Sequence, residues 1–125
     1  MYIIFEGMPV TGKTTTAKMI AEKLNAQYLK SVVSNTAYGD LLQIIRGREE
    51  IADLFYQSDL LIDELRVISC LRSSDVVRDK TWVSTLAHLK THDIKIKDVS
   101  IAKLLREGYN QLKNFCIQPD LLVYL

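Results

Sequence analysis

The sequence has no feature that would direct the chain to a membrane, to secretion or to nucleic acid. It contains no run of about 18 apolar residues and no basic N-terminal segment followed by an apolar stretch, so neither a membrane helix nor a signal peptide is predicted. Its 16 Lys and Arg residues are interleaved with 15 Asp and Glu residues, which leaves a formal net charge of +1. No basic surface for nucleic acid is therefore indicated. We expect a cytoplasmic protein without a nucleic-acid or membrane partner.

Cysteine and histidine are scarce, which removes the usual zinc and disulfide patterns. Cys70 and Cys116 lack C-x-x-C spacing and a neighbouring histidine cluster, so two small buried hydrophobic residues are the better interpretation. His88 and His92 are four residues apart without a third ligand nearby, and we interpret them as surface residues. What remains is an ordinary composition of 125 residues, 48% of them hydrophobic and 25% charged. It predicts one soluble domain with a substantial core.

The most informative segment is a glycine-containing loop near the N-terminus. Residues 7–14 fit the pattern G-x-x-x-x-G-K-[ST] and follow an apolar run at residues 2–5. The two glycines let successive backbone N–H groups converge on phosphate oxygens, and the helix that follows points its positive end at the same anion. Lys13 adds a cation and Thr14 a hydroxyl for Mg²⁺. The pattern therefore predicts a bound nucleotide polyphosphate, held by Gly7, Met8, Pro9, Val10, Thr11, Gly12, Lys13, Thr14 and Thr15.

Apolar segments and helical patterns alternate along the rest of the chain. Strands are expected at residues 2–5, 27–33, 75–78 and 121–125, and helices from the loop to Leu24 and at 37–46, 49–71, 82–90 and 99–115. This alternation predicts an α/β fold in three layers, with a parallel sheet, right-handed crossovers and helices on both faces. No internal repeat is visible, so residues 1–125 are expected to form a single domain.

The segment from Glu49 to Leu71 contains no Gly or Pro and predicts one long helix. Its apolar positions step by three and four, and we expect one wide buried face made of Ile51, Leu54, Phe55, Leu61, Ile62, Leu65 and Ile68. Within this helix, residues 60–64 are similar to the apolar run and acidic pair with which many ATPases hold Mg²⁺ from the end of a strand. Because the pattern around them is helical, Asp63 and Glu64 are expected on the solvated side. An ATPase built on this pair is the less favoured alternative, and no Asn-Lys-x-Asp segment indicates a GTPase.

A better acidic candidate follows the third expected strand. Asp79 stands at the carboxyl end of residues 75–78, and ligands of open α/β sheets bind outside the carboxyl ends of the strands. Asp79 and the phosphate loop are therefore expected to face one crevice, where the carboxylate could hold a Mg²⁺-bound water or the phosphoryl acceptor. The alternative is that Asp79 caps the helix expected near Trp82.

Three blocks of sequence together resemble the thymidylate kinase and deoxynucleoside kinase group. They are residues 5–15 with the phosphate loop, residues 76–87 with Arg78-Asp79-Lys80 and Ser84-Thr85-Leu86-Ala87, and Pro119-Asp120-Leu121-Leu122-Val123-Tyr124-Leu125. In thymidylate kinases the middle block has Asp-Arg-Tyr followed by Ser-Ser-Leu-Ala, and the last has Pro-Asp-Leu-Thr-Ile-Tyr-Leu. The order and spacing agree over nearly the whole chain. The resemblance implies a P-loop NTPase-like fold and an ATP-dependent phosphotransferase with a nucleotide or nucleoside acceptor.

The resemblance also implies roles for individual residues. The phosphate loop would hold ATP with Mg²⁺, and Lys13 would be a catalytic cation. Asp79 would occupy the acidic catalytic position and share the metal with Thr14, while Lys80 stands where the family has a catalytic arginine. Phe55 resembles the phenylalanine that stacks on the acceptor base, and a core role on the long helix is an equal alternative. Phosphoryl transfer depends mainly on positioning and on cations, which Lys13 and Mg²⁺ would supply.

Departures from the family keep a second function open. Lys80 cannot reproduce the planar grip of arginine on phosphate, and residues 31–33 stand in place of Arg-Glu-Pro. Family members continue into an arginine-bearing lid and a fifth strand, so we expect the domain to be incomplete at its C-terminal end. The alternative function is a nucleotide-binding regulatory or assembly protein with little kinase activity. The strand at residues 121–125 is expected at an open sheet edge, where a homodimer or another protein partner would pair.

Overall fold

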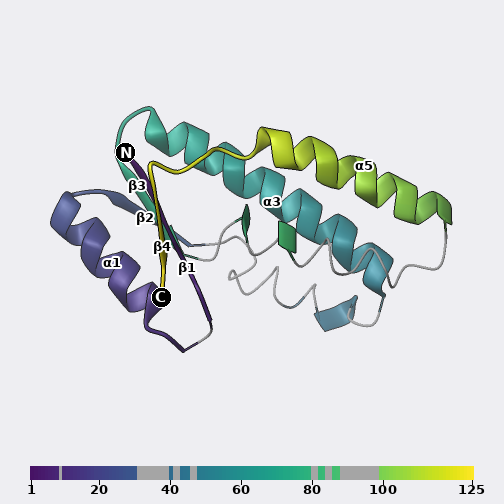
Figure 1. Ribbon diagram of the computed structural model, residues 1–125, viewed down its shortest axis with the longest axis horizontal. Helices are drawn as coiled ribbons and strands as arrows, with labels where there is room; N and C mark the ends of the chain where they lie inside the picture. Colours follow the sequence, from purple (N-terminus) through teal and green to yellow (C-terminus); the bar gives the residue numbers. More distant parts are fainter. Residues whose placement is uncertain are drawn as a thin grey trace.

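The computed structural model describes residues 1–8, 10–30, 40, 43–45, 48–79, 82–83, 86–87 and 99–125. Its centre is a four-stranded parallel sheet in the order β2-β3-β1-β4 (Figure 1). The strands are β1 (Tyr2–Glu6), β2 (Gln27–Leu29), β3 (Val76–Asp79) and β4 (Leu121–Tyr124). All four strands therefore end at the same edge of the sheet, next to the loop that follows β1.

Helices cover both faces of this sheet. Helix α1 (Lys13–Leu24) lies on one face, and α3 (Glu49–Leu71) with α5 (Val99–Phe115) lies on the other (Figure 1). The expected three-layer α/β fold is thus confirmed. The bounds of α3 and α5 agree with the predicted segments. The α3 segment contains neither Gly nor Pro, and α5 continues through Gly108.

The side chains of β1 alternate between the two layers. Ile3 and Phe5 pack with Ala17 and Ala21 of α1, whereas Tyr2 and Ile4 belong to a second cluster with residues of α3 and β3. A strand that is covered on both sides buries every position, and all five residues of β1 are buried. This explains why its residues 2–5 form a continuous apolar run rather than an alternating one.

The predicted burial of α3 is wrong, although its bounds are right. Five of the seven apolar residues expected inside are 38% to 53% exposed, namely Ile51, Leu54, Leu61, Ile62 and Leu65. The helix instead turns acidic residues inward, and Asp53, Asp59, Asp63 and Glu64 are buried. The physical reason at Asp63 and Glu64 is a buried cation, because Arg78 of β3 projects from the sheet between them. The solvated acidic pair expected from the helical pattern is therefore corrected to a buried and paired one.

Other expectations fall partly or wholly beyond the described residues. Strand β2 ends at Leu29, and residues 31–33 of the expected strand are outside the described part, as are most of the helices expected at 37–46 and 82–90. Strand β4 forms one edge of the sheet, and the protein partner expected there stays a prediction. Among the described helices, none is both long and apolar enough to cross a membrane.

Candidate functional site

The loop between β1 and α1 has the backbone of an anion-binding turn. Gly7, Val10 and Gly12 have φ angles of 142°, 64° and 80°. A positive φ is unusual for a β-branched residue such as Val10 and marks a backbone that its surroundings hold in place. A turn that passes through such conformations can point several of its N–H groups toward a common anion, which suits a phosphate. Pro9, the one expected loop residue not placed, lies outside the described residues.

Two side chains of the loop fold back onto its own backbone. The Thr11 hydroxyl donates a hydrogen bond to the Met8 carbonyl at 2.9 Å, and the Lys13 ammonium donates to the same oxygen at 3.1 Å. The Met8 and Val10 side chains are exposed. The Lys13 ammonium therefore lies against the loop. Backbone N–H groups and a cation are thus available to a phosphate at the same place.

Helix α1 begins at this loop, and its own first turn carries no acidic side chain that would offset its positive end. Gly12 occupies the N-cap in a left-handed conformation, and within the described residues no side chain caps the helix and no acidic residue occupies its first turn. The first N–H groups of a helix lack partners inside the helix and favour an anion. The first turn of α1, which holds Lys13, Thr14 and Thr15, is thus suited to phosphate oxygens.

Asp79 lies where the carboxyl-end rule placed it, beside the phosphate loop. It is the last residue of β3, pairs in register with Phe5 of β1 and is buried. The Thr14 hydroxyl donates a hydrogen bond to its Oδ2 atom. A threonine hydroxyl and a carboxylate are oxygen ligands of the type that Mg²⁺ takes together with substrate phosphates and waters. The residues present thus fit a magnesium–nucleotide complex.

A second donor to Asp79 was missed by the sequence analysis. The Tyr28 hydroxyl, from β2, donates to Asp79 Oδ1 at 2.6 Å. Burial, and then the neighbouring Asp79, raise the pKa of Tyr28 above its ordinary value of 10.0, so this hydroxyl keeps its proton at neutral pH. The Lys18 ammonium lies 5.5 Å from the centre of the Tyr28 ring, within reach of a cation–π contact. In the sequence, Tyr28 is only one residue of a short strand.

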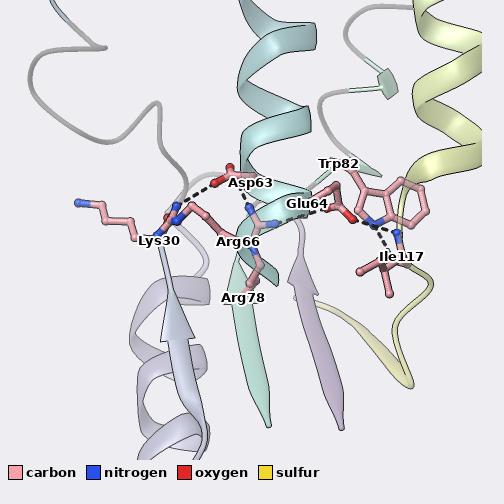
Figure 2. A network of polar contacts seen from close by, with 7 residues as sticks. All are labelled: Lys30, Asp63, Glu64, Arg66, Arg78, Trp82 and Ile117. Carbon is pink, nitrogen blue, oxygen red and sulfur yellow. Dashed lines mark hydrogen bonds and ion pairs between the residues drawn. The ribbon is translucent and has the colours of Figure 1, made fainter. Parts of the chain in front are cut away.

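A network of polar contacts lies on the opposite side of β3 (Figure 2). Arg78 contacts Asp63 at 3.0 Å and Glu64 at 3.5 Å, and all three side chains are almost fully buried. Glu64 Oε2 also accepts the backbone N–H of Ile117 at 2.9 Å, and the Ile117 carbonyl accepts the Trp82 indole N–H at 3.1 Å. The network joins α3 to β3 and to the segment between α5 and β4. It therefore supports the strand whose last residue is Asp79.

Arg66 extends this network to the protein surface. Its guanidinium contacts Asp63 at 2.9 Å and donates a hydrogen bond to the Lys30 carbonyl at 3.0 Å (Figure 2). Asp63 thus receives two arginines, one buried and one partly exposed. Since Lys30 directly follows β2, the contact ties α3 to the end of a second strand.

Glu64 is expected to make stability depend on pH. Burial raises the pKa of Glu64 from 4.5, and this outweighs the Ile117 N–H and Arg78, which lower it. As the pH rises above 4.5, the unfolded chain loses this proton before the folded protein does, so the wild type loses stability. Glu64→Gln removes the titration. We expect the wild type to lose stability relative to the variant as the pH rises above 4.5 in urea unfolding, and a constant difference between the two would contradict this.

The two remaining candidates are placed differently. Phe55 lies in α3, half-buried, with its ring edge-on to Tyr56 at a centroid distance of 6.3 Å. Its role as a stacking residue stays a prediction, beside the alternative of helix packing. Lys80 follows Asp79 directly but lies outside the described residues.

Comparison with known proteins identifies similar chains over almost the full length. A family model described as "ATPase family associated with various cellular activities (AAA)" matches residues 3–109. A probable thymidylate kinase of Methanococcus vannielii is 28% identical over 127 residues, which cover 99% of this chain and 59% of that protein. The chain thus spans about three fifths of the length of this relative.

Solved structures show the same fold. A thymidylate kinase from Candida albicans superposes with a TM-score of 0.69 at 19% identity, covering 99% of this chain and 61% of that one. A deoxyadenosine kinase from M. mycoides superposes with a TM-score of 0.74 at 18% identity, covering 99% and 63%. The P-loop fold class and the resemblance to thymidylate and deoxynucleoside kinases are therefore confirmed.

Proposed function

The chain belongs to the ATPase family associated with various cellular activities, and we propose that it acts as a nucleotide kinase that moves the γ-phosphate of ATP to a nucleoside or nucleoside monophosphate. The likeness to a probable thymidylate kinase over 99% of the chain supports this activity. The observation that carries the proposal is the contact between Thr14 and Asp79, because it places a hydroxyl and a carboxylate beside the phosphate loop. Since the chain spans 59% of that relative's length, the relative's name does not by itself assign a substrate or partners to this chain.

The donor triphosphate would lie along the loop. Backbone N–H groups of residues 7–15 would bind its phosphate oxygens, and Lys13 would leave the Met8 carbonyl to pair with them. Thr14 and Asp79 would hold Mg²⁺, which supplies positive charge to the phosphates when bound. Because transfer of a phosphoryl group depends on position and charge rather than on covalent help, the loop needs no nucleophile of its own.

The acceptor would lie beyond the carboxyl ends of β2 and β3. Asp79 is an acidic group at this edge, and Lys80 would offset charge on the moving phosphoryl group. Phe55 would contact the acceptor base. This role is proposed on the resemblance to thymidylate kinases alone.

A second candidate is a nucleotide-binding protein with little turnover. Membership of a family that is named for ATPases, and not for a phosphoryl acceptor, favours it. It would not use the acidic pair Asp63 and Glu64 to activate water, because both lie in α3 and contact Arg78. In this case ATP would bind at the same loop without an acceptor.

Substitution of Lys13 separates the two functions. We expect ADP to form from ATP and Mg²⁺ only when a nucleoside or nucleoside monophosphate is present, and Lys13→Ala to lower this rate by about 100-fold or more because the phosphates lose their cation. Lys23→Ala is the matched control, since Lys23 is exposed in the last turn of α1. ADP production would be followed across a panel of acceptors.

Other outcomes of this assay decide against the kinase. ATP hydrolysis without an acceptor, or ATP binding without turnover, would favour the second candidate. Equal activity of Lys13→Ala and Lys23→Ala would contradict a role of the phosphate loop in either function. Calorimetric titration with ATP distinguishes loss of binding from loss of turnover.

A further inference from the structure

Both carboxylate oxygens of Asp79 accept a hydrogen bond from a protein hydroxyl. Thr14 of α1 donates to Oδ2, and Tyr28 of β2 donates to Oδ1 at 2.6 Å. The two donors come from different elements, one a helix and the other a neighbouring strand. Rotation of the carboxylate group would break at least one of these bonds, so its plane is fixed in the folded protein.

The strand register explains why Tyr28 reaches Asp79. Tyr28 pairs with Val77 of β3, two residues before Asp79, and side chains two apart in a strand lie on the same face. On this face Tyr28 packs with the cluster that joins α1 to the sheet. Its ring also receives the Lys18 ammonium at 5.5 Å. The ring therefore has its own packing contacts, and its hydroxyl is the part that engages the carboxylate.

We propose that Tyr28 is a positioning residue for the magnesium–nucleotide complex, because its hydroxyl holds the Asp79 carboxylate in the orientation that the metal requires. This inference rests on the proposed metal role of Asp79 and adds a residue that the motifs do not contain. Carboxylates that bind metals are themselves oriented by hydrogen bonds, and loss of such a bond typically lowers metal affinity about 10-fold to 100-fold. Tyr28 would act through Asp79 without touching the nucleotide.

Tyr28→Phe tests the hydroxyl alone. The ring, its packing and the Lys18 contact remain, so the melting temperature should change little. We expect the Mg²⁺ concentration that half-saturates the gain in ATP affinity to rise about tenfold, while ATP affinity in EDTA stays unchanged. Both are measured by calorimetric titration with ATP. Tyr109→Phe is the matched control, because Tyr109 packs in a distant cluster between α3 and α5.

A double-mutant cycle with Asp79→Asn separates the possible failures. If Tyr28 acts through Asp79, Tyr28→Phe adds no further change in the Asp79→Asn background. A Mg²⁺ response that shifts in Asp79→Asn but not in Tyr28→Phe would overturn the positioning role and leave the metal role of Asp79 intact. An unchanged response in Asp79→Asn would overturn both. Equal losses of ATP affinity with and without Mg²⁺ in Tyr28→Phe would show a merely structural residue and also overturn the inference.

Discussion

Arg78→Met is expected to lower the free energy of unfolding by about 3–5 kcal/mol. The substitution removes the cation between Asp63 and Glu64, which lie in α3 and are almost fully buried. Methionine fills a similar volume, so the loss comes from leaving two buried acids without their shared partner rather than from a cavity. Urea unfolding followed by circular dichroism gives the change.

Two further variants identify the cause of that loss. Arg66→Met removes the other arginine of Asp63, which is 40% exposed, and is expected to cost at most about 1 kcal/mol. The triple variant Asp63→Leu, Glu64→Gln and Arg78→Met removes the charges together, and the amide oxygen of the introduced glutamine remains as an acceptor for the Ile117 N–H. It should recover at least half of the stability lost in the single variant. Equal losses in Arg66→Met and Arg78→Met would contradict the buried-cation account.

The same cluster shows where inference from the sequence stops. A spacing of three and four predicted the bounds of α3 correctly, because helix formation depends on residues near one another in the chain. Which side of α3 faces the sheet depends on Arg78, located 15 residues beyond Asp63 and in a different element. A helical pattern treats acidic residues as solvated by default. It therefore placed Leu61 and Leu65 inside and Glu64 outside, the reverse of the structure.

The residues of the candidate site likewise fall into those that the sequence predicts and those that it does not. The phosphate loop is contiguous, so its motif predicted the residues and the geometry that follows β1. The position of Asp79 could also be predicted, because parallel strands end at a common edge. The contact of Tyr28 with Asp79 could not be predicted, because it requires that β2 pair with β3 in the register that sets Tyr28 opposite Val77. A one-residue shift would turn the tyrosine to the other face of the sheet.

The two loop glycines are expected to respond differently to alanine, and Gly7 is the more sensitive. A Cβ at Gly7 would lie 2.2 Å from the Leu125 carbonyl oxygen, which is backbone. Leu125 cannot withdraw easily, because its N–H donates to the Glu6 carbonyl at 3.0 Å and extends the pairing of β4 with β1. Gly7 also has a φ of 142°, a conformation that side chains rarely adopt. Gly12 has a φ of 80°, but a Cβ there would meet open space.

Gly7→Ala is therefore expected to cost more than about 3 kcal/mol, since backbone strain of about 1–3 kcal/mol adds to a clash that must separate β4 from β1. Gly12→Ala carries only the left-handed strain of about 1–2 kcal/mol. Urea unfolding of both variants measures the two costs, and calorimetric titration with ATP should show Gly12→Ala still binding when folded. Equal stability losses, or a stable Gly7→Ala protein that binds ATP normally, would contradict the close approach of β4 to the phosphate loop. If only Gly7→Ala loses stability and ATP binding, the geometry of the phosphate loop depends on β4 as well as on the loop's own glycines.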